Sequence, residues 1–100
     1  MSNNNLKRIL VLDPNVEASL DQLTSSDRLS VTRAFDLIQQ DLDGILSMDT
    51  NLQKLILKDR NLYEYTIPTA SNLRIIMEVR EQAIVILQVF EKDKSKTPIL

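Results

Sequence analysis

The fold is decided by the stretch LYEYTIPTASNLRIIMEVREQAIVILQVFEKDKSKTP, which runs from Leu62 to Pro98. Two of its segments, Leu73 to Arg80 and Ala83 to Phe90, are rich in β-branched residues, which favour strands. Only Glu81 and Gln82 lie between these segments, and so short a connection is typical of a tight antiparallel hairpin. The stretch therefore predicts a sheet in which these two strands are neighbours.

The residues before this hairpin extend the predicted sheet. Leu62 to Ile67 is strand-like and carries two tyrosines, and Pro68 to Asn72 forms a polar loop that leads into the hairpin. Further upstream, Lys54 to Lys58 contains alternating leucines, and Asp59 to Asn61 reads as a turn. The second half of the chain is therefore expected to form three or four antiparallel strands.

The N-terminal half predicts one strand and two helices. Within Leu6 to Leu12, the apolar run Ile9 to Leu12 suits a short buried strand. Asp13-Pro14 is a helix-start signal, because an aspartate accepts from free N–H groups and proline fits the first helical position. Ser25 to Asp27 supplies a break and a second N-cap. The apolar residues of the first helix recur at helical spacing, and they are Val16, Leu20 and Leu23.

The second helix carries an amphipathic stripe that runs over about four turns. Gly44, the one glycine of the chain, is expected to end it. The stripe consists of Val31, Ala34, Phe35, Ile38, Leu42 and Ile45. The predicted fold class is α+β, with an N-terminal strand and a helical hairpin packed on an antiparallel sheet of three to four strands. The helices cover one face of that sheet, and the other face is the candidate working surface.

Composition narrows the chemistry that the chain can perform. The 100 residues include no cysteine and no histidine, which excludes disulfides, thiolate metal sites and the usual Ser/His or Cys/His nucleophiles. Any catalysis must therefore use Arg, Lys, Asp, Glu or Tyr, and we expect neither a metal nor a cofactor. The hydrophobic fraction of 43% suits a single domain over residues 6–100, preceded by a disordered tail at residues 1–5. No apolar run is long enough for a bilayer and no signal peptide is evident, so a cytoplasmic location is expected.

The order of elements and several motifs resemble the RelE/ParE toxin superfamily. The Leu62 to Pro98 stretch matches a family pattern in which an aromatic-bearing strand precedes a loop, an arginine-led strand, an aliphatic strand and a basic tail. Lys54-Leu55 stands where the family often opens its second strand. The ending VFEKDKSKTP is similar to the Phe-x-Lys-Lys…Lys-Thr-Pro signature of the phage-derived HigB-like branch. The segment SLDQLTSSDRLSVTRAFDLIQQ resembles that branch's helical hairpin more loosely.

The resemblance implies the toxin of a type II toxin–antitoxin module, held by a cognate antitoxin. Such toxins inhibit translation as ribosome-dependent mRNA interferases: they activate the 2′-hydroxyl of messenger RNA to attack the adjacent phosphate. The positions that match the family make Arg74 the phosphate clamp and Lys92 a second catalytic cation. Lys94 and Lys96 continue the basic tail and are the implied RNA-binding residues; Tyr63 stands at a family position that is usually structural, and with Tyr65 it is a further RNA-binding candidate on grounds of strand geometry. Preorganised cations suit this chemistry, because phosphoryl transfer spreads negative charge over the phosphate oxygens.

Other residues depart from the ribonuclease pattern. Glu64 and Thr66 fall where ribonuclease members place lysines, and Glu91 and Asp93 alternate with the cations of the tail. The formal net charge is −2, whereas attraction to RNA calls for positive charge. A second hypothesis is therefore a diverged member of the fold without nuclease activity, which acts as a ParE-like gyrase inhibitor or only binds its antitoxin. A third is a structural or assembly protein on a coincidental scaffold.

Strand geometry makes these site predictions testable. With a hairpin loop of only Glu81 and Gln82, Arg74 would lie opposite Val89 and Lys92 would point to the other face, whereas one more loop residue would restore both to one face. The alternative for Arg74 is an ordinary ion pair with Glu64 or Glu78 on an exposed face. Tyr63 and Tyr65 share a face of their strand, as either a packed cluster or a platform for stacking bases.

Overall fold

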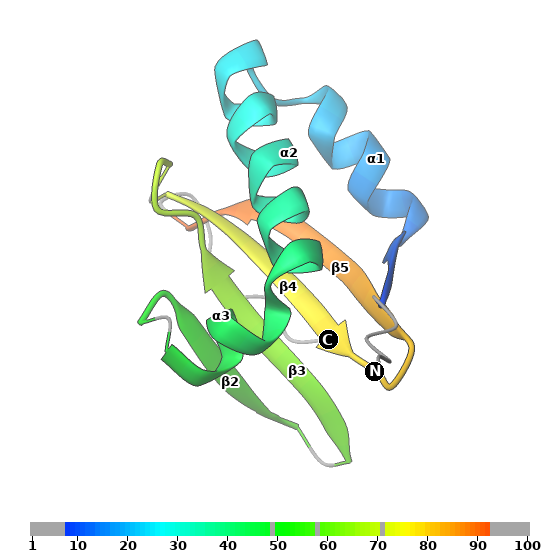
Figure 1. Ribbon diagram of the computed structural model, residues 1–100. Coiled ribbons are helices and arrows are strands. Elements are labelled where there is room, and N and C mark those ends of the chain that lie inside the picture. Colours follow the sequence, from blue (N-terminus) through cyan, green and yellow to red (C-terminus); the bar gives the residue numbers. More distant parts are fainter. Residues whose placement is uncertain (1–7, 49, 58, 71, 93–100) are drawn as a thin grey trace.

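The computed structural model describes residues 8–48, 50–57, 59–70 and 72–92. These residues contain five strands and three helices (Figure 1). The elements follow one another as β1 (Ile9–Leu12), α1 (Pro14–Asp21), α2 (Ser25–Gln40), α3 (Leu42–Met48), β2 (Leu52–Leu57), β3 (Arg60–Thr66), β4 (Leu73–Val79) and β5 (Ala83–Glu91). The predicted α+β class is confirmed, and the order of elements matches the prediction except that the second predicted helix is divided into α2 and α3. The expected tail at residues 1–5 lies outside the described residues.

The sheet has the order β1-β5-β4-β3-β2. The strands β2 to β5 form the predicted antiparallel series, and β1 joins its end by pairing in parallel with β5, from Ile9 opposite Ala83 to Leu12 opposite Ile86. The predicted turn at Asp59 to Asn61 is shorter than expected, because β3 already begins at Arg60, which pairs with Leu57. The chain thus places its first strand beside its last.

Both long helices begin at capping side chains. The carboxylate of Asp13 accepts a hydrogen bond from the backbone N–H of Asn15 at 3.1 Å, and Pro14 occupies the first turn of α1, as predicted. The cap of α2 is Thr24 and not the predicted Ser25 to Asp27 segment. Its hydroxyl accepts from the N–H of Asp27 at 3.1 Å, so Asp27 lies in the first turn of the helix.

The predicted second helix is interrupted. Its backbone leaves the helical region at Asp41, with φ −141° and ψ 48°, so α2 ends at Gln40 and α3 begins at Leu42. Gly44 lies inside α3, and the prediction that it ends the helix is wrong. A Cβ at this glycine would lie 2.5 Å from Oδ2 of Asp41. Glycine therefore lets the first turn of α3 sit close to the Asp41 carboxylate.

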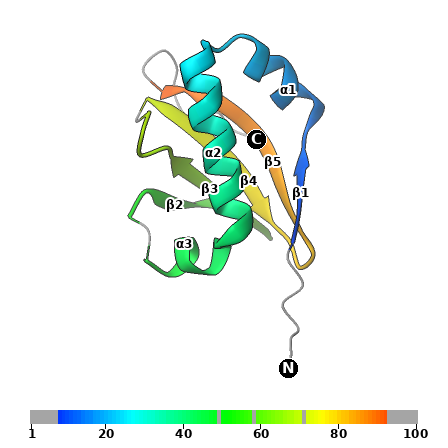
Figure 2. The same cartoon turned by 45° about the horizontal axis from the view of Figure 1, so that its top comes forward.

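The helices lie over one face of the sheet, with α2 crossing β3 and β4 (Figures 1 and 2). The core forms between these layers, and on β4 it takes alternate residues, which are Leu73, Ile75, Met77 and Val79. The intervening residues Arg74, Ile76 and Glu78 therefore point to the opposite side. We call that side, which none of the described helices covers, the helix-free face. No helix in the described part of the chain is long and apolar enough to cross a membrane.

Candidate functional site

A β-bulge decides which side chains of β5 share a face with Arg74. The hairpin loop contains Glu81 and Gln82 as predicted, closed by a 2.8 Å hydrogen bond from the N–H of Arg80 to the carbonyl of Ala83. The pairing then shifts, since Met77 lies opposite Ile86 but Ile76 lies opposite Gln88. Leu87 is therefore an extra residue, and an extra residue reverses the alternation of everything that follows it.

The bulge brings the two predicted catalytic cations to the helix-free face. Arg74 lies opposite Phe90 and not opposite Val89. The N–H of Lys92 donates to the carbonyl of Asn72 at 2.8 Å, which continues the ladder beyond β5. The two-residue loop therefore does not separate Arg74 from Lys92, because the bulge supplies the residue that a longer loop would have supplied.

Glu64 lies between these two cations. Nη1 of Arg74 is 3.1 Å and Nζ of Lys92 is 3.6 Å from Oε2 of Glu64, whose side chain is only 5% exposed. Burying a carboxylate is costly unless cations and hydrogen-bond donors compensate its charge. Glu64 therefore holds the side chains of Arg74 and Lys92 next to each other on the sheet. The formal charges of these three residues sum to +1.

A second carboxylate of the helix-free face, Glu78, also lies between two cations. Nε of Arg60 is 3.1 Å from Oε2 of Glu78, and Nη2 of Arg80 is 2.8 Å from Oε1. The hydrogen bond from Arg60, followed by that from Arg80, holds the pKa of Glu78 below its ordinary value of 4.5, against the opposing effect of burial. The same bond to Glu78 raises the pKa of Arg60. We refer to Arg60, Glu78 and Arg80 as the distal cluster.

The two clusters give the molecule an uneven charge distribution. Among the residues that the structure describes, the two clusters place four cations and two carboxylates on the helix-free face, which is a formal surplus of two positive charges. The segment 13–48, which forms the helical layer, contains seven acidic and two basic residues and is negative by five. The formal charge of −2 for the whole chain therefore does not report this local surplus of positive charge, and a locally positive surface attracts polyanions.

The tyrosines lie on the opposite side of the sheet from these clusters. Tyr65 pairs with Ile75, is fully buried and belongs to the core beneath the helices. Tyr63 packs against that core, with Nζ of Lys54 5.9 Å from the centre of its ring. The prediction of a base-stacking platform is wrong for Tyr65, and the alternative of a packed cluster describes both tyrosines. Lys94 and Lys96 lie outside the described residues.

Sequence reasoning missed two neighbours of the Arg74 cluster. Phe90 lies directly opposite Arg74, and Gln88 lies opposite Ile76, which in turn is opposite Glu64. Within the described part of the chain, the side-chain oxygen of Gln88 is buried without a hydrogen-bond partner. No pattern in the sequence marks the bulge at Leu87, and without the bulge Gln88 and Phe90 would be assigned to the core.

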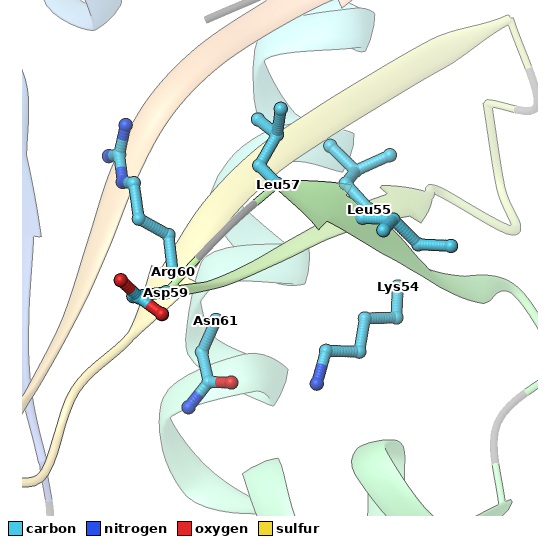
Figure 3. Close-up of a pocket in the computed structure, with 7 residues that line it drawn as sticks. Lys54, Leu55, Leu57, Asp59, Arg60 and Asn61 are labelled. Carbon is cyan, nitrogen blue, oxygen red and sulfur yellow. The ribbon is translucent and has the colours of Figure 1, made fainter.

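A shallow hollow of about 550 Å³ surrounds the β2–β3 hairpin. Figure 3 shows Leu57 and Arg60 pointing to one side of the hairpin, and Lys54 and Asn61 pointing to the other. The hollow therefore wraps around the edge of the sheet and is too open to enclose a small molecule. Its relevance to the site is that it leaves Arg60 accessible at the end of the helix-free face.

The arrangement of helices and strands is the fold of the RelE-type toxins. No family model matches the chain, and no curated protein matches it. Among solved structures, a chain of the archaeal RelE–RelB complex from Pyrococcus horikoshii is similar, with a TM-score of 0.69 and 17% identity over 89% of this chain and 99% of that one. A chain of the RelB–RelE antitoxin–toxin complex from Methanococcus jannaschii has a TM-score of 0.54 and 16% identity over 84% and 92% of the two chains. The YoeB dimer of Staphylococcus aureus gives a TM-score of 0.62 and 16% identity over 82% and 93%.

Proposed function

We propose that this chain is the toxin of a toxin–antitoxin pair and that it cuts messenger RNA on the ribosome. The observation that carries the proposal is the Arg74–Glu64–Lys92 cluster on the positive face of a RelE-type fold. Its protein partner is a cognate antitoxin, and its site of action is the cytoplasm. The Lys96-Thr97-Pro98 ending supports the HigB-like branch of these toxins.

The residues of the cluster suit an attack by a 2′-hydroxyl on the neighbouring phosphate. Arg74 and Lys92 bind the phosphate oxygens and stabilise the negative charge that develops on them. Glu64 is the carboxylate in contact with both cations, so it is the base that takes the proton of the 2′-hydroxyl. The new O2′–P bond replaces the P–O5′ bond, and the leaving 5′-oxygen takes a proton from the Lys92 ammonium. The products are a 2′,3′-cyclic phosphate and a 5′-hydroxyl.

The ion pairs of the resting site have a role in this scheme. In the free protein, Glu64 compensates the charges of Arg74 and Lys92 and holds their side chains in position. An RNA phosphate competes for the same N–H groups, since guanidinium and ammonium groups bind phosphate well. As the phosphate takes over these N–H groups, the carboxylate is displaced from Arg74 and Lys92 and can accept the proton of the 2′-hydroxyl. The acidic residue at this position is thus compatible with catalysis.

The test is RNA cleavage in a cell-free translation extract, mapped by primer extension and by analysis of the new ends. We expect the wild-type protein to cut translated messenger RNA and leave 2′,3′-cyclic phosphates. Arg74→Ala should reduce the rate by about 100-fold or more, as the loss of one transition-state donor does elsewhere. Arg33→Ala, which removes an exposed arginine of α2 on the opposite side, is the matched control. A folded wild-type protein that leaves the RNA intact would contradict the proposal.

The second candidate is a toxin of the same fold that acts without cutting RNA, as a ParE-like inhibitor of DNA gyrase. The observation in its favour is that Glu64 neutralises one of the two cations on which the nuclease depends. Supercoiling by purified gyrase distinguishes the two candidates. Inhibition of supercoiling together with intact RNA would select the second.

A further inference from the structure

The distal cluster has the features of a built anion site. Glu78 engages Nε and Nη2 of both arginines, at 3.1 and 3.4 Å for Arg60 and at 3.2 and 2.8 Å for Arg80. Within the described residues, the Nη1 groups of both arginines have no protein acceptor. The Glu78 side chain is 11% exposed, whereas those of Arg60 and Arg80 are 43% and 60% exposed. A nearly buried carboxylate thus orients two accessible guanidinium groups, and the cluster keeps a charge of +1.

We propose that Arg60 and Arg80 form a second phosphate site, which binds the backbone of single-stranded RNA a few nucleotides from the phosphate held at Arg74 and Lys92. This inference rests on the proposed function, and it extends that function from one scissile phosphate to a track along β4. Guanidinium groups suit the task, because their planar N–H pairs match two phosphate oxygens at once.

The position of the distal cluster relative to the first cluster supports RNA as the occupant. Arg74 and Glu78 point to the same face of β4, and Arg80 follows directly after the strand. The six residue steps from Arg74 to Arg80 span about 20 Å at the usual rise of a strand. A row of cation sites along one sheet face follows an extended polyanion, whereas the acidic helical layer repels it from the other side.

Direct binding tests this site separately from cleavage. The probe is a short fluorescent single-stranded RNA with 2′-O-methyl groups, which cannot be cut by 2′-attack, and the readout is fluorescence anisotropy at several salt concentrations. The variant Arg60→Gln/Glu78→Gln/Arg80→Gln removes the cluster without leaving an unpaired buried carboxylate. We expect this variant to bind the RNA about 10-fold more weakly. The plot of log K against log salt concentration should also become less steep by about 0.7 to 1.4, which corresponds to the loss of one or two phosphate contacts.

The helical layer offers a control of the same composition. Asp21→Asn/Arg28→Gln/Arg33→Gln also removes one carboxylate and two arginines, including the Arg28–Asp21 pair at 2.9 Å. It changes the net charge by the same amount and should leave the affinity within about 2-fold, since distant charges are screened. If the two triple variants bind RNA equally, the proposal is overturned.

Two further arms keep the result interpretable. The variant Arg60→Lys/Arg80→Lys keeps both positive charges and their pairing with Glu78, so it replaces the triple variant if that protein unfolds. We expect this double variant to bind RNA more weakly, because lysine lacks the planar pair of N–H groups of a guanidinium, and to keep the salt dependence of the wild type. A triple variant that binds RNA like the wild type but loses a poly-glutamate peptide would instead assign the cluster to an acidic protein partner. Weakened RNA binding by the triple variant, in a protein that cuts no RNA, would refute the nuclease and leave the phosphate track standing.

Discussion

Arg74 and Lys92 meet at one oxygen of Glu64, although an uninterrupted hairpin would have placed them on opposite faces of the sheet. The extra residue Leu87 makes the meeting possible, because it reverses the alternation of β5 between Ile86 and Gln88. Bulges are frequent beside functional sites, where they redirect a side chain. Here the bulge turns the end of β5 so that Phe90 and Lys92 join Arg74.

The carboxylate of Glu64 is expected to stabilise the fold as well as to serve the reaction. Glu64→Gln removes the carboxylate that pairs with both Arg74 and Lys92, so the free energy of unfolding should fall by about 2 kcal/mol. Urea denaturation measures this change, and a double-mutant cycle with Arg74→Met isolates the coupling between the two side chains. A coupling close to zero would show that the pair contributes nothing to stability. Cleavage by Glu64→Gln should fall by at least about 100-fold if Glu64 is the base.

Glu78 is expected to make the protein sensitive to acid. Its pKa in the folded state lies below the ordinary value of 4.5, so the unfolded chain binds the proton more tightly. The stabilisation from ionised Glu78 is therefore fully present above about pH 4.5 and is lost as the pH falls through the lower folded-state pKa. Urea denaturation across this range should show a shallower acid loss for Glu78→Gln. Glu17→Gln, on the exposed side of α1, is the control, and an equal slope for Glu78→Gln and the wild type would contradict the prediction.

The unpartnered oxygen of Gln88 is expected to cost stability. Gln88→Met keeps a similar volume and removes the buried acceptor, so it should raise the free energy of unfolding by about 1 kcal/mol. Gln53→Met on β2 is a matched control, because Gln53 is exposed and its replacement should change stability by less than about 0.5 kcal/mol. A destabilised Gln88→Met protein would mean that the amide has a role which the folded contacts do not account for.

The buried position of Tyr65 separates stability from RNA binding. Tyr65→Leu removes part of a fully buried ring and should lower the free energy of unfolding by about 2 kcal/mol. The folded fraction of this variant should bind single-stranded RNA with the affinity of the wild type, because the side chain lies beneath the helices. Anisotropy at a temperature where the variant is folded provides the measurement. Weaker RNA binding by fully folded Tyr65→Leu would show that this tyrosine does contribute to RNA binding.

Much of the fold was predictable from local patterns. The β-branched runs and the loop of Glu81 and Gln82 predict β4, β5 and their hairpin, and Asp13-Pro14 predicts the start of α1. The break at Asp41 was not predictable, because the apolar stripe continues across it from Ile38 to Leu42. Periodicity reports which side of an element is buried, and it does not report where the backbone bends.

Two residues of the candidate site could be named from the sequence, but their geometry could not be predicted. Arg74 and Lys92 came from the family resemblance, but their common face depends on Leu87, which looks like any other apolar residue of a strand. The role of Arg80 was hidden for a different reason, since it follows β4 and reaches back to Glu78. The net charge of −2 was the most misleading argument against a surface that attracts RNA, because a sum over the chain does not report which layer of the fold holds each charge.

The pairing of β1 with β5 has a consequence for the order of events during synthesis. Ile9 to Leu12 emerge from the ribosome early, yet the strand that accepts them, Ala83 to Glu91, is among the last described segments to be made. Contacts between such distant parts of the chain form late in folding. Lys92 follows directly after that same strand, so the cation cluster is completed only when the sheet closes. A nascent chain therefore lacks the complete Arg74–Glu64–Lys92 cluster until its last described strand has been made and has joined the sheet.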